Sequence, residues 1–425
     1  MGDQGTSGPG TPHHLVDHLF RNRAGQMVAW LARVFGPAHL DLAEEVVQDA
    51  LVKALQRWPY SGIPDNPSGW LLTVARNGAL DVLRRNASFA GRAHEIAREL
   101  ERATKGSDED STVEDDELRM IFMCCHPSLT PDARIALSLK TVGGFGVAEI
   151  ASAFLTTDAA IAQRLVRAKR ALRDNKVGLE LPAGQELAER LDSVLAVIYL
   201  LFNEGYSAHA GEQAVRQDLC GEAMRLGQIV TRSAHLARTR APVAHALNAL
   251  MSFQAARLPA RVDENGELVL LEDQDRARWD HGLVARGFAH LERSAEGDEM
   301  STYHVQASIA AVHAGAATPD ETRWPAILAL YDDLVALNPS PVVRLNRVVA
   351  LSKVEGPAPA LAALADIERE PALAHYSLLP AVKARLLAEV GDLQGAAGAY
   401  RRALAEPCTE PERRFLLRRL AACEE

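Results

Sequence analysis

Cysteine is scarce in this sequence, and the few cysteines do not suit a cross-linked or zinc-bound scaffold. There are five, an odd number, and no two form a C-x-x-C pair. This excludes a disulfide framework or a zinc site as the basis of the fold. Cys124 and Cys125 precede His126, but neighbouring side chains on a helix point about 100° apart, so we interpret them as packing residues. We expect no metal and no cofactor.

Long apolar runs and targeting signals are also missing. No stretch approaches the roughly 20 apolar residues needed to cross a bilayer, so no membrane partner is expected. The first residues, MGDQGTSGPGTPHH, lack the charged and apolar regions of a signal peptide. We therefore expect a cytoplasmic protein. Residues 1–13 are rich in Gly, Ser, Thr and Pro, which predicts a disordered N-terminus.

Motifs for covalent chemistry are absent. The sequence contains no G-x-S-x-G, H-E-x-x-H or G-x-x-x-x-G-K-[ST] pattern, and GGFGVAE lacks the third glycine of a dinucleotide fingerprint. Glu204 and His209 resemble an acid/base pair, but nothing nearby supplies a nucleophile or a metal. We interpret both as structural residues and expect no catalytic residue and no enzymatic activity.

Positive charge is in deficit overall but locally concentrated. The net charge of −10 argues against nucleic-acid binding, because phosphate contacts come from Lys and Arg. However, basic residues cluster at Arg84-Arg85 and from Arg164 to Arg173, whereas acids dominate Asp108 to Glu117. An acidic body with basic patches can bind DNA locally without binding it indiscriminately.

The stretch from Pro131 to Arg173 has the pattern of a helix-turn-helix. Ile135, Leu137 and Leu139 mark a first helix, the glycine-rich GGFG ends it, and a short helix follows from Val147 to Phe154. After a tight turn, the hydroxyl of Thr157 is placed to cap the next helix.

That last helix has one apolar stripe and one cationic face. The predicted buried stripe consists of Ile161, Leu165, Ala168 and Leu172; the opposite face carries Gln163, Arg164, Arg167, Arg170 and Arg173. A short helix, a tight turn and a longer cationic helix are typical of a DNA-reading motif whose second helix enters the major groove. The structural alternative is an ordinary helical hairpin with a solvated arginine face.

The N-terminal part predicts further amphipathic helices. One spans His14 to Phe35, and the next starts at Asp41 with a core stripe of Leu42, Val46, Ala50 and Leu55. RWPYSGIPDNPSGW predicts a loop between Trp58 and Trp70, and a third helix starts at Ser68. Aromatic residues beside arginines suit stacking on unpaired bases, although each Trp alone is more typical of a core anchor.

Three motifs together resemble a known family. DLAEEVVQDALVKALQRW, PSGWLLTVARNGALDVLRRN and the helix ending in AAIAQRLVRAKRALR are similar to regions 2 and 4 of the sigma-70 family. Their order and spacing resemble extracytoplasmic-function (ECF) sigma factors, which keep only these two domains. The resemblance covers roughly Leu15 to Arg173. It implies binding to core RNA polymerase, through the β′ clamp helices and the β flap, and to promoter DNA.

The resemblance also implies roles for particular residues. The residues expected to bind core polymerase are Glu45, Gln48, Asp49 and Lys53. Those expected at the −10 element, where a base is flipped into a pocket, are Asn66, Trp70, Asn77, Arg84 and Arg85. Those expected at the −35 element are Thr157, Gln163, Arg164, Arg167 and Arg170. Among the last set, Gln163 and Arg167 suit base reading, whereas Arg164 and Arg170 suit phosphates. Ala160 and Ala162 depart from the larger or polar residues of many relatives.

The remaining segments complete the predicted domain order. Region 2 is placed at 14–90, an acidic mobile linker at 91–117, region 4 at 118–176, a helical middle domain at 185–300 and helical repeats at 320–425. Leu268 to Asp280 either lines a pocket or docks two helical layers. Tyr331, Leu364 and Tyr400 recur at 33 and 36 residues, near the ~34-residue tetratricopeptide period, which predicts a concave surface for a protein or peptide partner.

We therefore expect an all-α protein that directs polymerase to specific promoters, regulated by its own C-terminal helical extension. Two other interpretations stay open on the sequence. A helix-turn-helix transcriptional regulator with a helical sensory or interaction domain would bind duplex DNA without polymerase. A tetratricopeptide scaffold would need no DNA at all.

Overall fold

The computed structural model describes residues 12–85, 94, 96–98, 109–154, 156–206, 216–233, 236, 241–264, 267–374 and 376–424. Most of these residues are helical, and the only β pairing among them is an isolated bridge between Val262 and Leu268. The all-α prediction is confirmed. No membrane-spanning helix occurs in this part of the chain. The chain divides into two compact units, Met1–Val197 and Ile198–Glu425.

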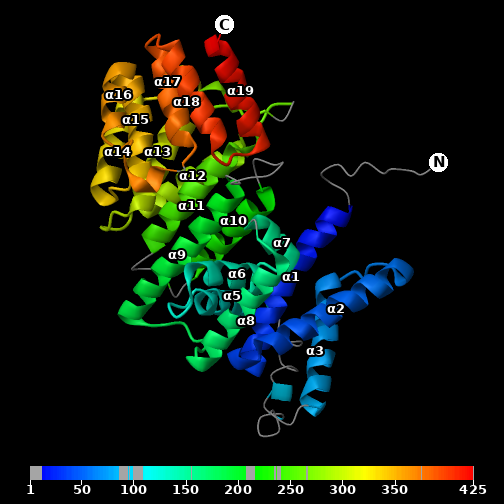
Figure 1. The fold of residues 1–425 in the computed structure, drawn as a ribbon. Coiled ribbons are helices and arrows are strands. Elements are labelled where there is room, and N and C mark those ends of the chain that lie inside the picture. Colours follow the sequence, from blue (N-terminus) through cyan, green and yellow to red (C-terminus); the bar gives the residue numbers. More distant parts are fainter. Residues whose placement is uncertain are drawn as a thin grey trace, which may run out of the picture. The chain divides into compact units, whose positions relative to one another are not determined.

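The first unit opens with three helices, α1 (Pro12–Phe35), α2 (Leu40–Ser61) and α3 (Pro67–Arg85) (Figure 1). The predicted loop starts later than expected, because α2 continues through Pro59. Pro59 sits in the last turn, where Gly62 N still donates to Trp58 O at 3.0 Å and closes the helix. The predicted core stripe is confirmed at Val46 and Ala50, but Leu42 is only half-buried and Leu55 is 64% exposed. Other buried residues of α2 are Leu40, Ala43, Val47 and Ala54.

Four helices follow, α5 (Glu109–Cys124), α6 (Pro131–Thr141), α7 (Val147–Ala153) and α8 (Asp158–Asp174). The predicted mobile linker was wrong in its last residues, because 109–117 belong to α5. Asp116 and Glu117 are buried, where Arg33 Nε donates to Asp116 Oδ2 at 2.9 Å and Gln26 Nε2 to Glu117 Oε2 at 3.2 Å. Partners on α1 therefore turn an acidic, linker-like pattern into part of the core. Most of 91–108 lies outside the described residues.

The second unit contains a group of helices around α11 (Ala241–Ala256), which is buried on nearly every face. Its neighbours include α10 (Gln217–Arg232), α12 (His281–Ser294) and α13 (Thr302–Ala314). Gly287 of α12 fits directly over the Phe253 ring, since a Cβ there would lie 2.6 Å from a ring carbon. The helix α9 (Gly184–Tyr206) spans the boundary between the two units. Glu204 is in α9, whereas His209 lies outside the described residues.

Six further helices complete this unit, with successive helices packed together (Figure 1). They are α14 (Trp324–Leu337), α15 (Pro341–Glu355), α16 (Pro357–Ala365), α17 (Leu378–Glu389), α18 (Leu393–Ala405) and α19 (Glu410–Glu424). The recurring residues Tyr331, Leu364 and Tyr400 fall on alternate helices, α14, α16 and α18. This placement suits two-helix repeats, but the tetratricopeptide assignment stays a prediction.

A histidine pair predicts acid sensitivity of the second unit. His245 Nδ1 and His290 Nδ1 are 2.8 Å apart, and burial followed by the charge of His245 lowers the pKa of His290 to about 4. Between the ordinary pKa of about 6.5 and the folded value, the unfolded chain binds more protons, so stability falls as pH drops through this window. We expect the free energy of unfolding of this unit to fall by about 1–3 kcal/mol from this pair between pH 7 and pH 4.5.

Thermal unfolding of the full chain across this pH range, beside His290→Gln, measures the effect. Gln can hydrogen-bond but does not titrate, so the variant should show a smaller loss of Tm on acidification. An identical pH profile in both proteins contradicts the assignment.

Candidate functional site

The helix-turn-helix pattern is formed by α7 and α8. Thr157 has extended backbone angles, and its hydroxyl oxygen accepts from Ala160 N at 3.2 Å, which caps α8 as predicted. The predicted stripe Ile161, Leu165, Ala168 and Leu172 is confirmed as the set of buried residues of this helix. The side chains between these positions are thereby held on the outside.

The outer face of α8 keeps most of its polar side chains available. Gln163, Arg167 and Arg170 are exposed. Arg164 is half-buried and lies 3.6 Å from the Asp132 carboxylate, and Arg170 lies 3.5 Å from Asp174. Exposed ion pairs of this kind contribute little to stability, so these guanidinium groups can exchange a carboxylate for a phosphate at small cost.

Sequence reasoning missed Lys169, which joins α8 to α2. Its ammonium lies 2.7 Å from Asp41 Oδ1 and 2.8 Å from Glu44 Oε2, and the side chains of Lys169 and Glu44 are each only 12% exposed. Burial alone would lower the pKa of Lys169, but the charge of Glu44 and hydrogen bonds to both carboxylates raise it. Arg173 adds a 3.9 Å contact with Asp41. The first turn of α2 is therefore held against α8.

Removing this ammonium should loosen the contact. In Lys169→Met, Glu44 stays largely buried without its partner, so we expect a loss of about 2 kcal/mol in the free energy that holds α8 on α2. Hydrogen exchange of the backbone amides in α8 and at the start of α2 should become faster. Glu44→Leu in addition should restore much of the protection, because it removes the unpaired carboxylate. Arg170→Met is the control, and unchanged exchange in Lys169→Met contradicts the prediction.

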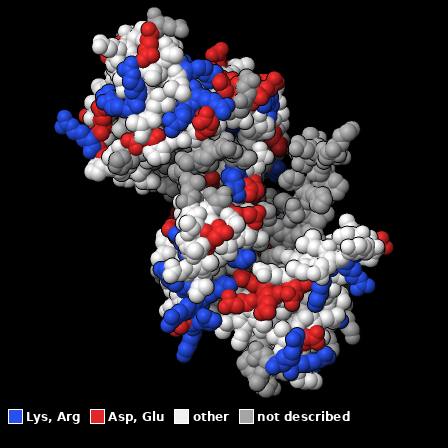
Figure 2. Space-filling model, turned by 45° about the vertical axis from the view of Figure 1, so that its right-hand side comes forward, with Lys and Arg blue, Asp and Glu red and all other residues white. Residues whose placement is uncertain are grey.

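The polar face of α2 lies beside α3. The predicted polymerase-binding residues Glu45, Gln48, Asp49 and Lys53 are all exposed. Three of them line a groove of about 490 Å³ whose other wall, from α3, includes Asp81 and Arg85. Figure 2 shows a band of acidic side chains across the lower half of that view, with Lys and Arg gathered on both sides. The groove thus brings predicted polymerase-binding residues next to a predicted −10 residue.

The loop between α2 and α3 is anchored by tryptophans. The rings of Trp58 and Trp70 meet edge to face with centroids 5.5 Å apart. Asn66 caps α3, because its Oδ1 accepts from Gly69 N at 2.8 Å. Asn77 accepts from Arg76 NH2 at 3.3 Å.

Arg84 pairs with Asp81 at 3.3 Å, and Arg85 Nε donates to Asp81 O at 3.1 Å. Both remain exposed at the end of α3. Their contacts lie within their own helix, so their outward faces stay available to phosphates.

Large exposed side chains surround this loop, whose residues 60–66 the resemblance to the sigma-70 family implies as the holder of the flipped −10 base. Tyr60 is 93% exposed, and Val52, Leu55 and Ile63 are exposed as well. Tyr60 and Trp70 line a second depression, of about 540 Å³, together with Arg57. Exposed apolar side chains beside a cationic, aromatic-lined depression are typical of a surface that contacts a partner. Apolar residues that recur every 3.6 positions can form either an exposed contact surface or a buried core, so the spacing alone does not distinguish the two.

Three family models match the chain. Sigma-70 region 2 matches residues 19–89, sigma-70 region 4 matches residues 119–172, and a family of unknown function (DUF6596) matches residues 190–295. An uncharacterized protein of Rhizobium meliloti (strain 1021) is 39% identical over 394 residues, which cover 92% of this chain and 91% of that protein. No solved structure matches the chain.

The helix-turn-helix coincides with the region 4 match, and α1 to α3 coincide with the region 2 match. The chain belongs to the sigma-70 family of non-catalytic transcription initiation factors. Within that family it is an ECF-like member with a long C-terminal extension that contains the DUF6596 segment. The two regions imply binding to core RNA polymerase and to promoter DNA.

Proposed function

We propose that this protein is an ECF-type sigma factor that binds core RNA polymerase, directs it to a particular set of promoters and starts transcription there. The observation that carries the proposal is the outer face of α8, where a buried stripe fixes exposed Gln163, Arg167 and Arg170 on one side. Such a helix suits the major groove. The protein acts in the cytoplasm, and its role requires no catalytic residue or cofactor.

Each surface takes one part of this role. Glu45, Gln48, Asp49 and Lys53 on α2 bind the β′ clamp helices, and region 4 also contacts the β flap. The −10 residues lie in the loop between α2 and α3 (Asn66), near the start of α3 (Trp70), in its middle (Asn77) and at its end (Arg84 and Arg85). At the −35 element Gln163 and Arg167 read bases, whereas Thr157, Arg164 and Arg170 position the helix on the backbone.

With α8 in contact with α2, the two domains are in a closed form. Elements centred near −35 and −10 are about 25 base pairs apart, which is about 85 Å at 3.4 Å per base pair. Lys169 instead holds region 4 within 2.8 Å of Glu44 on region 2. This contact has to open before both elements are read together. On α2, Glu45 directly follows Glu44, and Asp49 lies five residues after Glu44.

We further propose that the C-terminal extension regulates this opening. Truncation of the chain tests this regulation. The truncated chain should keep α9, because Arg190 NH2 on that helix donates to Phe122 O in region 4 at 2.7 Å. A chain ending at Tyr206 keeps this helix, whereas one ending at Glu180 loses it. We expect promoter-specific transcription by the chain ending at Tyr206 to differ at least about fivefold from that of the full chain, in line with typical coupling free energies. Equal activity of the two in vitro and in vivo contradicts regulation by the extension.

Binding to core polymerase is the first test of the proposed function. A sigma factor should elute with core polymerase on size exclusion, and the complex should melt a promoter that neither component melts alone. A repressor of the helix-turn-helix class would bind duplex DNA but not core polymerase. Absence of a complex with core polymerase contradicts the proposal.

A further inference from the structure

The second unit contains a cavity that the transcription role does not use. Its volume is about 660 Å³, within the range of small-molecule sites. One wall is the segment from Leu270 to Arg276, and the other comes from α14 and α15, with Trp324, Tyr331 and Val349 among the lining residues. Aromatic and aliphatic side chains thus face a cavity that also contains charged groups.

Arg276 lines this cavity as a buried cation without a carboxylate partner. The residue is only 9% exposed. Its NH1 donates to the backbone oxygens of His313 and Ala316, and its NH2 donates to Thr322 Oγ1 at 3.0 Å. Its Nε has no hydrogen-bond partner, and no ion pair joins Arg276 to any residue that the structure describes. Carbonyl and hydroxyl oxygens orient a guanidinium group but do not neutralise its charge.

A second guanidinium, that of the half-buried Arg257, adds to this positive charge. Arg257 and Arg276 lie 5.9 and 5.2 Å from the centroid of the Trp279 ring. Burial, and next the charge of Arg257, lowers the pKa of Arg276. His313 also lines the cavity, and burial followed by the same two arginine charges lowers its pKa to about 4, so it is neutral at pH 7. This part of the site therefore carries positive charge in a poorly hydrated place.

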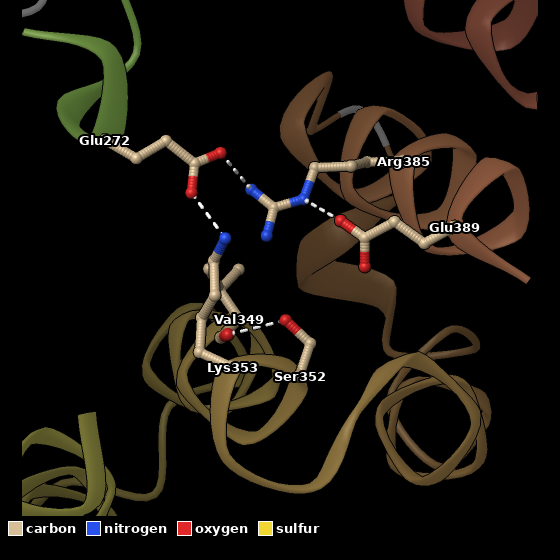
Figure 3. Close-up of polar contacts among 6 residues, drawn as sticks. All are labelled: Glu272, Val349, Ser352, Lys353, Arg385 and Glu389. Carbon is tan, nitrogen blue, oxygen red and sulfur yellow. Dashed lines mark hydrogen bonds and ion pairs between the residues drawn. The ribbon is translucent and has the colours of Figure 1, made fainter. Parts of the chain in front are cut away.

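Unlike Arg276, the other cations that line the cavity lie next to carboxylate groups (Figure 3). Glu272 lies 2.5 Å from Lys353 and 3.5 Å from Arg385, and Arg385 also lies 3.1 Å from Glu389. Asp273 and Asp320 also line the cavity. Glu321 acts on Arg276 only through space, and its Oε2 accepts from Ala317 N. Acids are thus present around the cavity, yet none pairs with Arg276.

We propose that this cavity binds a small organic anion, whose carboxylate or phosphate group pairs with Arg276 and whose flat apolar body packs beside Trp324. The anion takes the place of a directly paired carboxylate, which Arg276 lacks among the described residues, and charge-assisted bonds from a guanidinium are stronger than neutral hydrogen bonds. Trp324 lines the cavity beside His313, and the two rings meet edge to face with centroids 5.3 Å apart. This site is independent of the polymerase-binding and DNA-binding surfaces.

Calorimetric titration of the full chain tests the proposal, with benzoate and phenyl phosphate as probes and benzamide as the neutral control. We expect saturable 1:1 binding of at least one anionic probe, at least tenfold tighter than benzamide. Arg276→Gln should weaken that probe at least tenfold. Because Arg276 also holds backbone oxygens, Val349→Phe provides a second variant, which fills the cavity and leaves every charge in place. Arg414→Gln, on the exposed surface of α19, is the matched control and should bind like the unchanged protein.

Comparison of the two anionic probes distinguishes a carboxylate site from a phosphate site. The proposal is overturned if neither anionic probe binds, if benzamide binds equally well, or if Val349→Phe leaves the affinity unchanged. This experiment contains neither polymerase nor DNA. A negative result would therefore not contradict the proposed role in transcription. Likewise, a failure of that role would not contradict the anion site.

Discussion

Replacing Asp49 with Arg is expected to lower the affinity for core RNA polymerase by at least about 100-fold. Asp49 is exposed on α2 and lines the groove that also contains Glu45 and Lys53. Reversing one charge at a complementary interface replaces an attraction by a repulsion and costs several kcal/mol, whereas the fold loses nothing because the side chain faces solvent. Fluorescence anisotropy with labelled protein and core polymerase measures the change.

Glu180→Arg makes the same charge reversal at an exposed position outside this groove and should bind as the unchanged protein does. Circular dichroism of both variants checks that they remain folded. Equal affinity of Asp49→Arg and Glu180→Arg for core polymerase would show that this face of α2 does not contact it.

Changing the recognition helix is expected to produce the second large effect. Gln163→Ala and Arg167→Ala should each reduce discrimination for the −35 element by about 1–3 kcal/mol, or roughly 5- to 150-fold, because each removes a contact to a base edge. Neither substitution disturbs the stripe that packs α8, since both side chains are exposed. Transcription by the reconstituted holoenzyme from promoters with intact and scrambled −35 elements measures this discrimination.

Arg170→Ala is the matched control on the same face. As a phosphate contact it should weaken binding uniformly across sequences and reduce the salt slope by about one, without relaxing specificity. If all three variants lose affinity equally on intact and scrambled elements, α8 contacts only the DNA backbone and the assignment of its base-reading residues is wrong.

Local physics explains which features the sequence predicted well. The buried stripe of α8 follows from a period of 3.6 residues, and its cap follows from a hydroxyl next to a helix start. Both depend on residues within one helix. The all-α fold and the position of the helix-turn-helix follow for the same reason.

The features that the sequence did not predict depend on contacts between residues that are distant in the chain. Lys169 looks like one more cation on α8 until Asp41 and Glu44 are placed beside it. Asp116 looks like part of a mobile acidic linker until Arg33 pairs with it at 2.9 Å. Leu55 has the spacing of a core residue but is exposed.

The segment from Leu268 to Asp280 shows why two interpretations had to stay open. It contacts the segments next to α11 and α14, since Arg278 NH2 donates to Pro259 O and Arg276 NH2 to Thr322 Oγ1. It also lines the cavity of the second unit. The sequence of a charged loop does not show which of its side chains form ion pairs. That Arg276 forms no ion pair with a described residue is therefore known only from the three-dimensional structure.

Transcription start-site mapping shows whether this protein gives core polymerase promoter selectivity. Core polymerase would transcribe fragmented genomic DNA with and without the purified protein, and the 5′ ends of the transcripts would be sequenced. If the protein is a sigma factor, we expect new start sites that share two sequence boxes near −35 and −10. These start sites should be absent when Asp49→Arg replaces the unchanged protein. If the protein adds no start site to those made by core polymerase alone, it is not a sigma factor.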